Sequence, residues 1–241
     1  ATPHLDRLAR EGMRFTDAHS PATVCTPTRY SLMTGQMAFR VPNGGTVFQG
    51  AGGPSLIAPG RLTLPAMLKQ AGYATAHFGK WHLTNTMVPD APSPSAYGYD
   101  AHGTFNSPGP QMPAHDDVRN AIAFIERTHA AGKPFFLNLW IHEPHTPHYP
   151  RPEYLARFAH LGSEAERIYA AVIAHADARI GELLAALDRL QLSDDTLVVF
   201  TSDNGPENTG PANRRLSDDE STGPGFDTFA SVGTTGGHRG R

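Results

Sequence analysis

Helix-like stretches of this chain alternate with short apolar runs, and this alternation constrains the fold more than any other feature. Thr63 is expected to cap a helix over residues 64–71, after which residues 73–78 have the composition of a strand. Apolar residues at helical spacing predict a second helix over residues 117–130, followed by a continuous apolar strand at residues 134–141. Helix and strand therefore follow each other twice.

A third pair of elements continues the pattern. Ser163 and Glu166 have the spacing of a capping box, which predicts a long helix reaching about Leu190. Residues 196–201 are then expected to form the next buried strand. Helices that alternate with apolar strands favour an α/β fold with a largely parallel sheet covered on both faces. Such sheets bind ligands at the carboxyl ends of their strands.

The remaining elements are expected to be short. Thr2 and Pro3 have the residue types of an N-cap and a first helical position, so a brief helix should run from there to Gly12. Residues 15–18 have the composition of a strand. Stretches rich in Gly, Pro, Ser and Asn are expected to form loops at the functional rim, at residues 41–60, 84–115 and 205–237.

Composition excludes several classes of function. The 241 residues suffice for one sizeable α/β domain. Charged residues make up 18% and the formal net charge is -3, so there is no cationic field of the kind that nucleic-acid or anionic-membrane binders use. One cysteine cannot form an internal disulfide. No apolar run reaches the roughly 18 residues of a membrane-spanning helix.

That single cysteine, Cys25, stands in a Cys-x-Pro-x-Arg frame that ends at Arg29. Residues 27–33 are expected to open a helix directly after it, which places the thiol at a helix N-terminus. Backbone N–H groups and the positive end of the helix dipole favour anions there. Arg29 follows one helical turn later, so its guanidinium can reach back toward residue 25.

Three later motifs stand near the ends of the expected strands. Lys80 and His82 lie two residues apart, hence on one side if the strand stays extended through them. Three His-x-Pro triplets follow the 134–141 strand. Asp203 and Asn204 offer the oxygen ligands that Ca²⁺ or Mg²⁺ prefers, although Asp-Asn-Gly by itself is more often a turn. Alternatively, residues 80 and 82 have no functional role and are simply an exposed lysine and a packed histidine.

Together, residues 25–29, 79–82, 144–147 and 201–205 resemble the motif blocks of the type I sulfatases, in that family's order. The resemblance implies the fold of the alkaline phosphatase superfamily, an α/β fold with a mixed, mostly parallel central sheet and helices on both faces. It also implies hydrolysis of a sulfate monoester. A formylglycine-generating enzyme would oxidise Cys25 to formylglycine, an aldehyde whose hydrate is the nucleophile.

The resemblance assigns roles to the other motif residues. Arg29 would hold the formylglycine hydroxyl, and Lys80 would bridge the sulfate and the nucleophile's oxygen. His82 would be the base that collapses the sulfated enzyme. Asp203 and Asn204, with residue 25, would bind one divalent cation, Ca²⁺ or Mg²⁺.

The three His-x-Pro triplets begin at His142, His145 and His148, and the motif alone does not choose among them. By the resemblance, the histidine that contacts the substrate comes nine residues after the second aromatic residue of the preceding strand, Phe136, which selects His145. His145 would serve as acid or hydrogen-bond donor to the leaving oxygen. His142 is the second candidate for this role. Alternatively, these histidines belong to a histidine-rich loop that binds no ligand.

Some polar and aromatic residues have a structural interpretation. His175, Asp177 and Arg179 interrupt the apolar face of the long helix, and we expect them to be satisfied by partners or solvated. Trp81 and Trp140 flank motifs and could line a pocket, but packing is the expected role.

The resemblance also predicts what lies outside the chain. Residues 1–241 would be a partial sulfatase catalytic domain, with a metal-binding Asp-Asp strand upstream and a sulfate-contacting lysine just after Arg241. The substrate would be a sulfate ester, either a small molecule or a sulfated sugar. The residues leave the compartment open, and the family favours a periplasmic or secreted protein.

Three other functions fit the same residues. A phosphonate or phosphate monoester hydrolase of the same superfamily could use the same metal and aldehyde. A catalytically dead fragment could bind sulfated glycans without turnover. A metal-dependent enzyme could leave the Cys25 thiol unmodified. Relative rates on aryl sulfates and aryl phosphonates would distinguish a phosphonate hydrolase from a sulfatase. The mass of the Cys25 peptide would show whether the thiol is unmodified.

Overall fold

A computed structural model describes residues 2–41, 55–84, 88, 90–105, 112–113, 115–145, 148, 150–206 and 232–233. The chain divides into two units. The sheet unit comprises Ser20–Ile141 and Thr201–Asn204, and the helical unit comprises Ala1–His19, His142–Phe200 and Gly205–Arg241. That residues 1–241 form a single catalytic domain stays a prediction.

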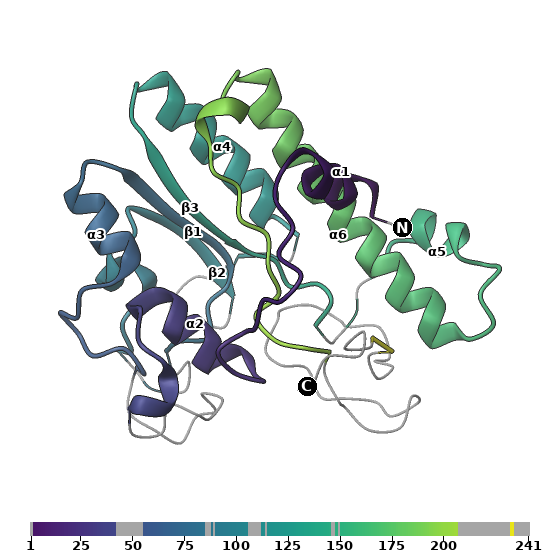
Figure 1. Cartoon of the computed structure of the whole chain (residues 1–241), viewed down its shortest axis with the longest axis horizontal. Coiled ribbons are helices and arrows are strands. Elements are labelled where there is room, and N and C mark those ends of the chain that lie inside the picture. The colour runs from purple at the N-terminus through teal and green to yellow at the C-terminus, as the bar shows by residue number, and fades with distance from the viewer. Residues whose placement is uncertain are drawn as a thin grey trace. The chain divides into compact units, whose positions relative to one another are not determined.

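The sheet unit is built around three parallel strands (Figure 1). Strand β1 (Ala74–Lys80) lies in the centre, between β2 (Ala101–Phe105) and β3 (Phe135–Trp140), and pairs in parallel with both. In the β1–β3 register, Gly79 lies opposite Trp140. Parallel strands need crossover connections, and helix α4 (Asp117–Ala130) lies in the chain between β2 and β3. The predicted parallel α/β architecture is confirmed.

Helices cover both faces of this sheet. On one face the Phe78 ring of β1 meets Phe124 of α4, with ring centroids 6.3 Å apart. On the other face His77 contacts Tyr99, and there α2 (Cys25–Thr34) contributes to the core. Each large side chain buried there contributes on the order of 1.5–3 kcal/mol. The buried residues of this core are Tyr30, Met33, Ala38, Ile57, Trp81, Leu83, Tyr97 and Tyr99.

Local sequence signals explain where the predicted helices of the sheet unit begin and end. Helix α3 spans Leu64–Gln70, and the Thr63 hydroxyl accepts a hydrogen bond of 3.3 Å from the Ala66 amide, as expected of an N-cap. Gly72 then turns the chain toward β1 with φ of 91°. Helix α4 has the predicted bounds. Of the apolar residues at helical spacing, Val118, Ala121 and Ile125 are buried, whereas Ile122 is partly buried.

The helical unit contains α1 (Pro3–Glu11), α5 (Pro152–Arg157) and α6 (Glu164–Arg189). The predicted capping box is present, since Ser163 and Glu166 exchange side-chain and backbone hydrogen bonds. The buried Asp177 carboxylate of α6 accepts hydrogen bonds from the His4 and Leu5 amides, at 3.2 and 2.9 Å. These amides belong to the first turn of α1, where backbone donors lack helical partners. Helix α6 therefore holds the start of α1.

Two predicted strands are wrong. Residues 15–18 and 196–201 form no ladder with any described strand. Apolar composition suggested burial, but Phe15 is 74% exposed and Leu197 is 89% exposed. A strand is stabilised by cross-strand partners, and an apolar run without such partners stays irregular. The short 3-10 helix η3 (Ser193–Asp195) precedes the second run.

Two further expectations need correction. The stretch 84–115 was expected to be loop, yet it contains the 3-10 helix η2 (Pro94–Tyr97) and strand β2. Strand β2 lies at the edge of the described sheet and includes a histidine and a glycine, so its sequence lacks an apolar pattern. Thr2 precedes α1, but its hydroxyl donates to Asp6 and caps no amide. Most of the other two predicted loops, residues 42–54 and 207–231, lies outside the described residues.

The 3-10 helix η1 (Ala38–Arg40) follows α2 in the chain and completes the described helical elements before α3. A search of the described helices finds none with the length and apolar character needed to cross a membrane.

Candidate functional site

Cys25 is the first residue of α2, as predicted. The preceding residue, Val24, has an extended backbone and makes no side-chain cap hydrogen bond to this helix. The neighbouring Thr26 hydroxyl donates a 3.0 Å hydrogen bond to the carbonyl oxygen of His82. The Cys-x-Pro-x-Arg motif is thereby tied directly to the motif that follows β1.

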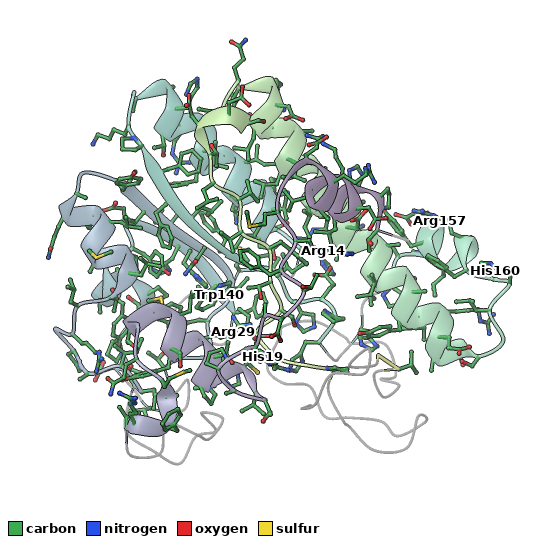
Figure 2. All side chains as sticks on the ribbon, in the orientation of Figure 1. Arg14, His19, Arg29, Trp140, Arg157 and His160 are labelled. Atoms are coloured by element: carbon green, nitrogen blue, oxygen red, sulfur yellow. The ribbon has the colours of Figure 1, made fainter. Side chains whose placement is uncertain are left out.

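Arg29 is 6% exposed and connects three parts of the sheet unit. Its Nε and Nη2 donate to Oδ2 of Asp203 at 3.1 and 2.7 Å, and its Nη1 donates to the carbonyl oxygen of Lys80 at 3.0 Å. The guanidinium also lies 4.5 Å from the centre of the Trp140 ring (Figure 2). These contacts fix the position of the cation.

Lys80 ends β1, and the residue is 2% exposed. Its carbonyl oxygen accepts a second hydrogen bond, from Nε2 of His77 at 3.1 Å. Because that carbonyl only accepts, Nε2 carries the proton. Burial, together with the nearby charge of Arg29, lowers the pKa of His77 to about 3, so its ring is neutral. Sequence reasoning missed His77. The only signal was its position three residues before Lys80 in a buried strand.

The end of β1 has an unusual backbone. Gly79 has φ of 101°, and a Cβ atom placed on it would lie 2.1 Å from the carbonyl oxygen of Trp140. Only glycine allows β3 to approach so closely. His82 has φ of 56°, in the left-handed region, so the extended backbone does not continue to it. The condition for Lys80 and His82 to share one side, a strand extended through both, is therefore not met.

Asp203 and Asn204 lie in the sheet unit, and Asp203 forms a 2.7 Å ion pair with Arg29. Burial of the carboxyl would raise the pKa of Asp203, but the charge and hydrogen bonds of Arg29 and the charge of Lys80 outweigh it, so the pKa lies below its usual value. The carboxylate is ionised at neutral pH. Its position after a strand was predicted incorrectly, because residues 196–201 form no ladder.

The donors at residues 203 and 204 fit a hard divalent cation. Nε and Nη2 of Arg29 both donate to Oδ2 of Asp203, so the carboxylate's Oδ1 is a further oxygen that can bind a cation. Asn204 adds an amide oxygen from the next residue. Ca²⁺ takes about six to eight oxygen ligands, so these two residues supply part of such a site.

The three His-x-Pro histidines belong to the helical unit. His142 and His148 are buried, whereas His145 is partly exposed. The His145 amide donates to the His142 carbonyl at 3.0 Å, and the two rings lie 5.7 Å apart. The bond between Glu143 and Pro144 is cis. Partial exposure favours His145 over His142 as the residue that can touch a ligand.

The two tryptophans have different environments. Trp81 is fully buried in the core of the sheet unit, which confirms the packing role expected of it. Trp140 also packs on that core, but its ring carries the guanidinium of Arg29 as well. The structure therefore adds Trp140 to the residues that shape the candidate site.

Comparison with known proteins agrees with this arrangement. The family model described as sulfatase matches residues 1–228. N-acetylgalactosamine-6-sulfatase of Canis lupus familiaris is 30% identical over 250 residues, covering 85% of this chain and 45% of that protein. N-acetylgalactosamine-6-O-sulfatase of Bacteroides thetaiotaomicron is 26% identical over 302 residues, with 86% and 54% covered.

Solved structures give the same result. The crystal structure of Ps i-CgsB matches with a TM-score of 0.76 and 25% identity, covering 85% of this chain and 53% of that one. The PsFucS1 sulfatase from a Pseudoalteromonas species matches with a TM-score of 0.68 and 26% identity, with 85% and 50% covered. Both solved structures therefore share the fold of this chain over most of its length.

This chain belongs to the sulfatase family, since the family model matches most of its length. The chain spans about half the length of the curated relatives it matches.

Proposed function

We propose that the intact protein containing this chain is a sulfatase that hydrolyses a sulfate monoester to an alcohol and inorganic sulfate. One observation carries the proposal: Cys25 begins α2, and Arg29 of the same helix contacts both Lys80 and Asp203 within the sheet unit. Three of the four predicted motifs thus meet around one buried arginine. Family membership and the named sulfatase relatives support the same activity.

In this proposal a formylglycine-generating enzyme converts Cys25 into formylglycine during maturation. The hydrated aldehyde would supply two hydroxyls, one that attacks sulfur and one whose deprotonation expels sulfate and restores the aldehyde. The N-terminus of α2 would favour the sulfate anion by roughly 0.3–1 kcal/mol. A plain serine or thiol would instead end as a stable sulfated side chain.

The cationic residues would bind and orient the ester. Lys80 would contact the sulfate and the nucleophile's oxygen, and Arg29 would hold the hydroxyl at residue 25. The hydrogen bond of Arg29 to the Lys80 carbonyl supports a joint role, because both residues then keep fixed positions. His82 would be the base, and the Thr26 hydrogen bond to its carbonyl supports its place beside residue 25.

Asp203 and Asn204, with residue 25, would hold a divalent cation, and the family resemblance favours Ca²⁺ over Mg²⁺. When bound, such an ion polarises a sulfate oxygen as a Lewis acid. The low pKa of Asp203 supports its role as a ligand, because an ionised carboxylate is available across the neutral range. His145 would donate a hydrogen bond or proton to the leaving oxygen, and His142 is the second choice.

The substrate class proposed is a sulfated sugar or an aryl sulfate. Several relatives are named N-acetylgalactosamine-6-sulfatase or N-acetylgalactosamine-6-O-sulfatase, and others are named arylsulfatase G. A phosphonate or phosphate ester remains the alternative, because the same nucleophile and cation suit either tetrahedral anion.

The experiment measures sulfate release by the intact gene product from a 6-sulfated N-acetylgalactosamine and from nitrophenyl sulfate, in the presence of Ca²⁺. Protein from a host with formylglycine-generating activity should turn over, whereas the same sequence from a host without that activity should not. Rates on nitrophenyl phosphonate should be lower than on the sulfate. Equal release by both preparations would contradict the proposal. Binding of the sugar with no release by either would favour the binding-only alternative.

A further inference from the structure

The segment 142–148, which we call the histidine loop, carries the residue proposed to protonate the leaving group. At the start of this loop, the His145 amide donates a hydrogen bond of 3.0 Å to the His142 carbonyl. Between these two histidines stands Glu143, an acidic residue that the proposed reaction does not use. Its environment shows what holds the loop.

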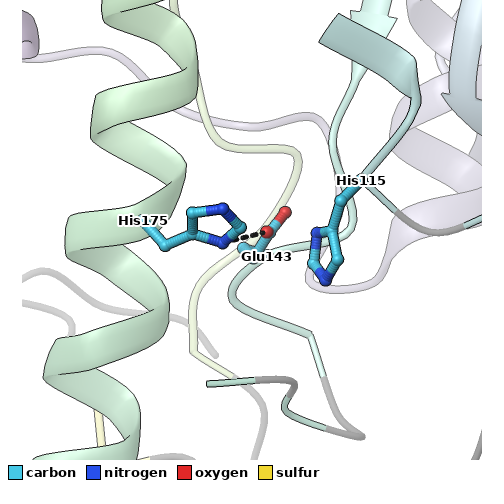
Figure 3. A group of neighbouring side chains, drawn as sticks. All are labelled: His115, Glu143 and His175. Atoms are coloured by element: carbon cyan, nitrogen blue, oxygen red, sulfur yellow. Dashed lines mark ion pairs between the residues drawn. The ribbon is translucent and has the colours of Figure 1, made fainter. Parts of the chain in front are cut away.

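The Glu143 carboxylate contacts two side chains of α6, Arg179 and His175. Nη1 of Arg179 donates to Oε1 and Oε2 of Glu143 at 3.1 and 3.2 Å. Nδ1 of His175 lies 3.6 Å from Oε1, and Figure 3 shows this ring beside the carboxylate. The side chains of Glu143 and Arg179 are 3% and 6% exposed. His175 and Arg179 are four residues apart, so they lie on the same face of the helix.

A second contact from the same helix lies further along the loop. Nε2 of His148 donates to the carbonyl oxygen of Pro144 at 3.0 Å, and the His148 ring meets the Tyr169 ring of α6 at 5.8 Å. Glu143 and His148 of the histidine loop therefore both contact α6. Since α6 is a helix of 26 residues with a complete capping box, it is a rigid base for these contacts.

A buried ion pair is weak evidence for stability, because desolvating both charges offsets their attraction. The ion pair does restrict geometry, because a buried guanidinium hydrogen-bonded to a carboxylate has few alternative arrangements. The Glu143 carboxylate is two residues from His145, so fixing it fixes the backbone on which His145 stands.

We infer that Arg179 is a positioning residue: through Glu143 it holds the histidine loop so that His145 meets the leaving oxygen of the substrate. This inference rests on the proposed sulfatase function and adds a residue to it. In that step a hydroxyl oxygen of the hydrated aldehyde at residue 25 bonds to sulfur while the bond between sulfur and the alcohol oxygen breaks. The electron pair of the broken bond goes to the alcohol oxygen, and the His145 N–H gives its proton to that oxygen.

The chemistry provides a test that a merely structural role would not pass. Leaving groups that are weak bases depart without help, whereas strongly basic alkoxides need a proton as they leave. A displacement of about 1 Å can cost roughly 100-fold in rate. A misplaced His145 should therefore slow esters with poor leaving groups far more than esters with good ones.

The experiment uses the intact, aldehyde-bearing gene product and a series of sulfate esters from nitrophenyl through phenyl to alkyl leaving groups. We expect Arg179→Met to lower kcat/KM about 100-fold for the alkyl ester and less than about tenfold for the nitrophenyl ester. Arg179→Lys, which keeps the charge, should lie between the wild type and Arg179→Met. Glu143→Gln keeps the side chain's shape and should repeat the result, even if Arg179→Met fails to fold.

The matched control is Asp177→Asn, a buried polar substitution on the same helix that holds α1 and does not touch the loop. It should lower the melting temperature without changing the dependence on the leaving group. Uniform losses across the ester series in both Arg179 variants and in Glu143→Gln would overturn the inference.

A readout without turnover separates this inference from the proposed function. The NMR signals of the His145 ring should shift or broaden in Arg179→Lys and in Glu143→Gln but not in Asp177→Asn. If the wild-type protein releases no sulfate, the proposed function is contradicted but the positioning role is not. Ring signals unchanged in both loop variants would sink the positioning role, whatever the activity.

Discussion

At the scale of single residues, the candidate site depends on a few groups that fix the backbone carbonyl of Lys80. That oxygen accepts hydrogen bonds from Arg29 and from His77, a cation and a neutral ring. Because His77 is fully buried, protonating it would place a second positive charge beside Arg29 in a dry environment. The site therefore requires a neutral His77.

Because of this requirement, the free energy of unfolding should depend on pH. The pKa of His77 is about 3 in the folded chain against 6.5 for the ordinary value, so below pH 6.5 the unfolded chain binds the proton and the folded chain does not. Stability should fall as the pH drops from 6.5 toward 3, by a few kcal/mol in total on the scale of about 1.4 kcal/mol per pKa unit. Urea unfolding at pH 7 and pH 5 measures this loss.

His77→Gln should flatten that pH dependence, whereas His129→Gln, at an exposed histidine of α4, should leave it unchanged. Equal slopes for His77→Gln and the wild type would show that another group controls the acid response.

Gly79 is the second residue with a sharp requirement. An alanine there would meet the Trp140 carbonyl at 2.1 Å in addition to the strain of φ at 101°. We expect Gly79→Ala to lower the free energy of unfolding by more than about 3 kcal/mol, since both strand spacing and backbone must change. Gly72→Ala is the matched control, because its φ is 91° but nothing lies within 4 Å of the added atom. It should cost only about 1 kcal/mol. Similar costs in urea titrations would contradict the close-approach argument.

At the scale of elements, α6 organises the helical unit. The Asp177 carboxylate of this helix accepts hydrogen bonds from two backbone amides of α1. Its Arg179 and His175 side chains contact Glu143 of the histidine loop. Asp177, Arg179 and His175 are all buried, together with the apolar residues of this helix. Polar residues within a long helix can thus fix neighbouring segments as well as pack.

Asp177→Asn should lower the free energy of unfolding by about 1.5–3 kcal/mol, because it weakens two charge-assisted hydrogen bonds to backbone amides. Asp188→Asn is the comparison, since the Arg7–Asp188 ion pair also joins α1 to α6 but both side chains are partly exposed, at 36% and 43%. Its cost should stay below about 1 kcal/mol. Thermal denaturation of both variants measures the difference, and a larger cost at Asp188 would reverse the ranking.

Elements with complete local signals were predictable from the sequence. Helix α4 and the capping box of α6 have periodic apolar residues and defined ends, and both are confirmed. Strand β2 was missed because its five residues, which include a histidine and a glycine, are too few to show a clear alternation of apolar and polar side chains. The false strand at 196–201 shows the opposite error, since apolar composition does not provide a partner strand.

The site was predictable only in part for the same reason. Motif order indicated Cys25, Arg29 and Lys80, and the structure brings Arg29 to Lys80. The Arg29–Asp203 ion pair spans 174 positions, and nothing local to either residue predicts it. The contact of Arg29 with Trp140 likewise depends on how a helix packs on a sheet.

At the scale of the whole molecule, the parallel sheet agrees with membership of the sulfatase family. If the nucleophile and cation are arranged for sulfate, nitrophenyl sulfate should be cleaved at least about tenfold faster than nitrophenyl phosphonate, which corresponds to about 1.4 kcal/mol in activation free energy. A preference for the phosphonate would assign the protein to the other hydrolase class without changing its fold.

The measurement that tests the account most directly is mass spectrometry of the Cys25 peptide from the intact gene product, purified from a host with formylglycine-generating activity, together with its sulfate release. We predict that the peptide carries an aldehyde in place of the thiol, and that the rate of sulfate release rises in proportion to the fraction converted. An unmodified thiol in a preparation that hydrolyses sulfate esters at the full rate would contradict the account.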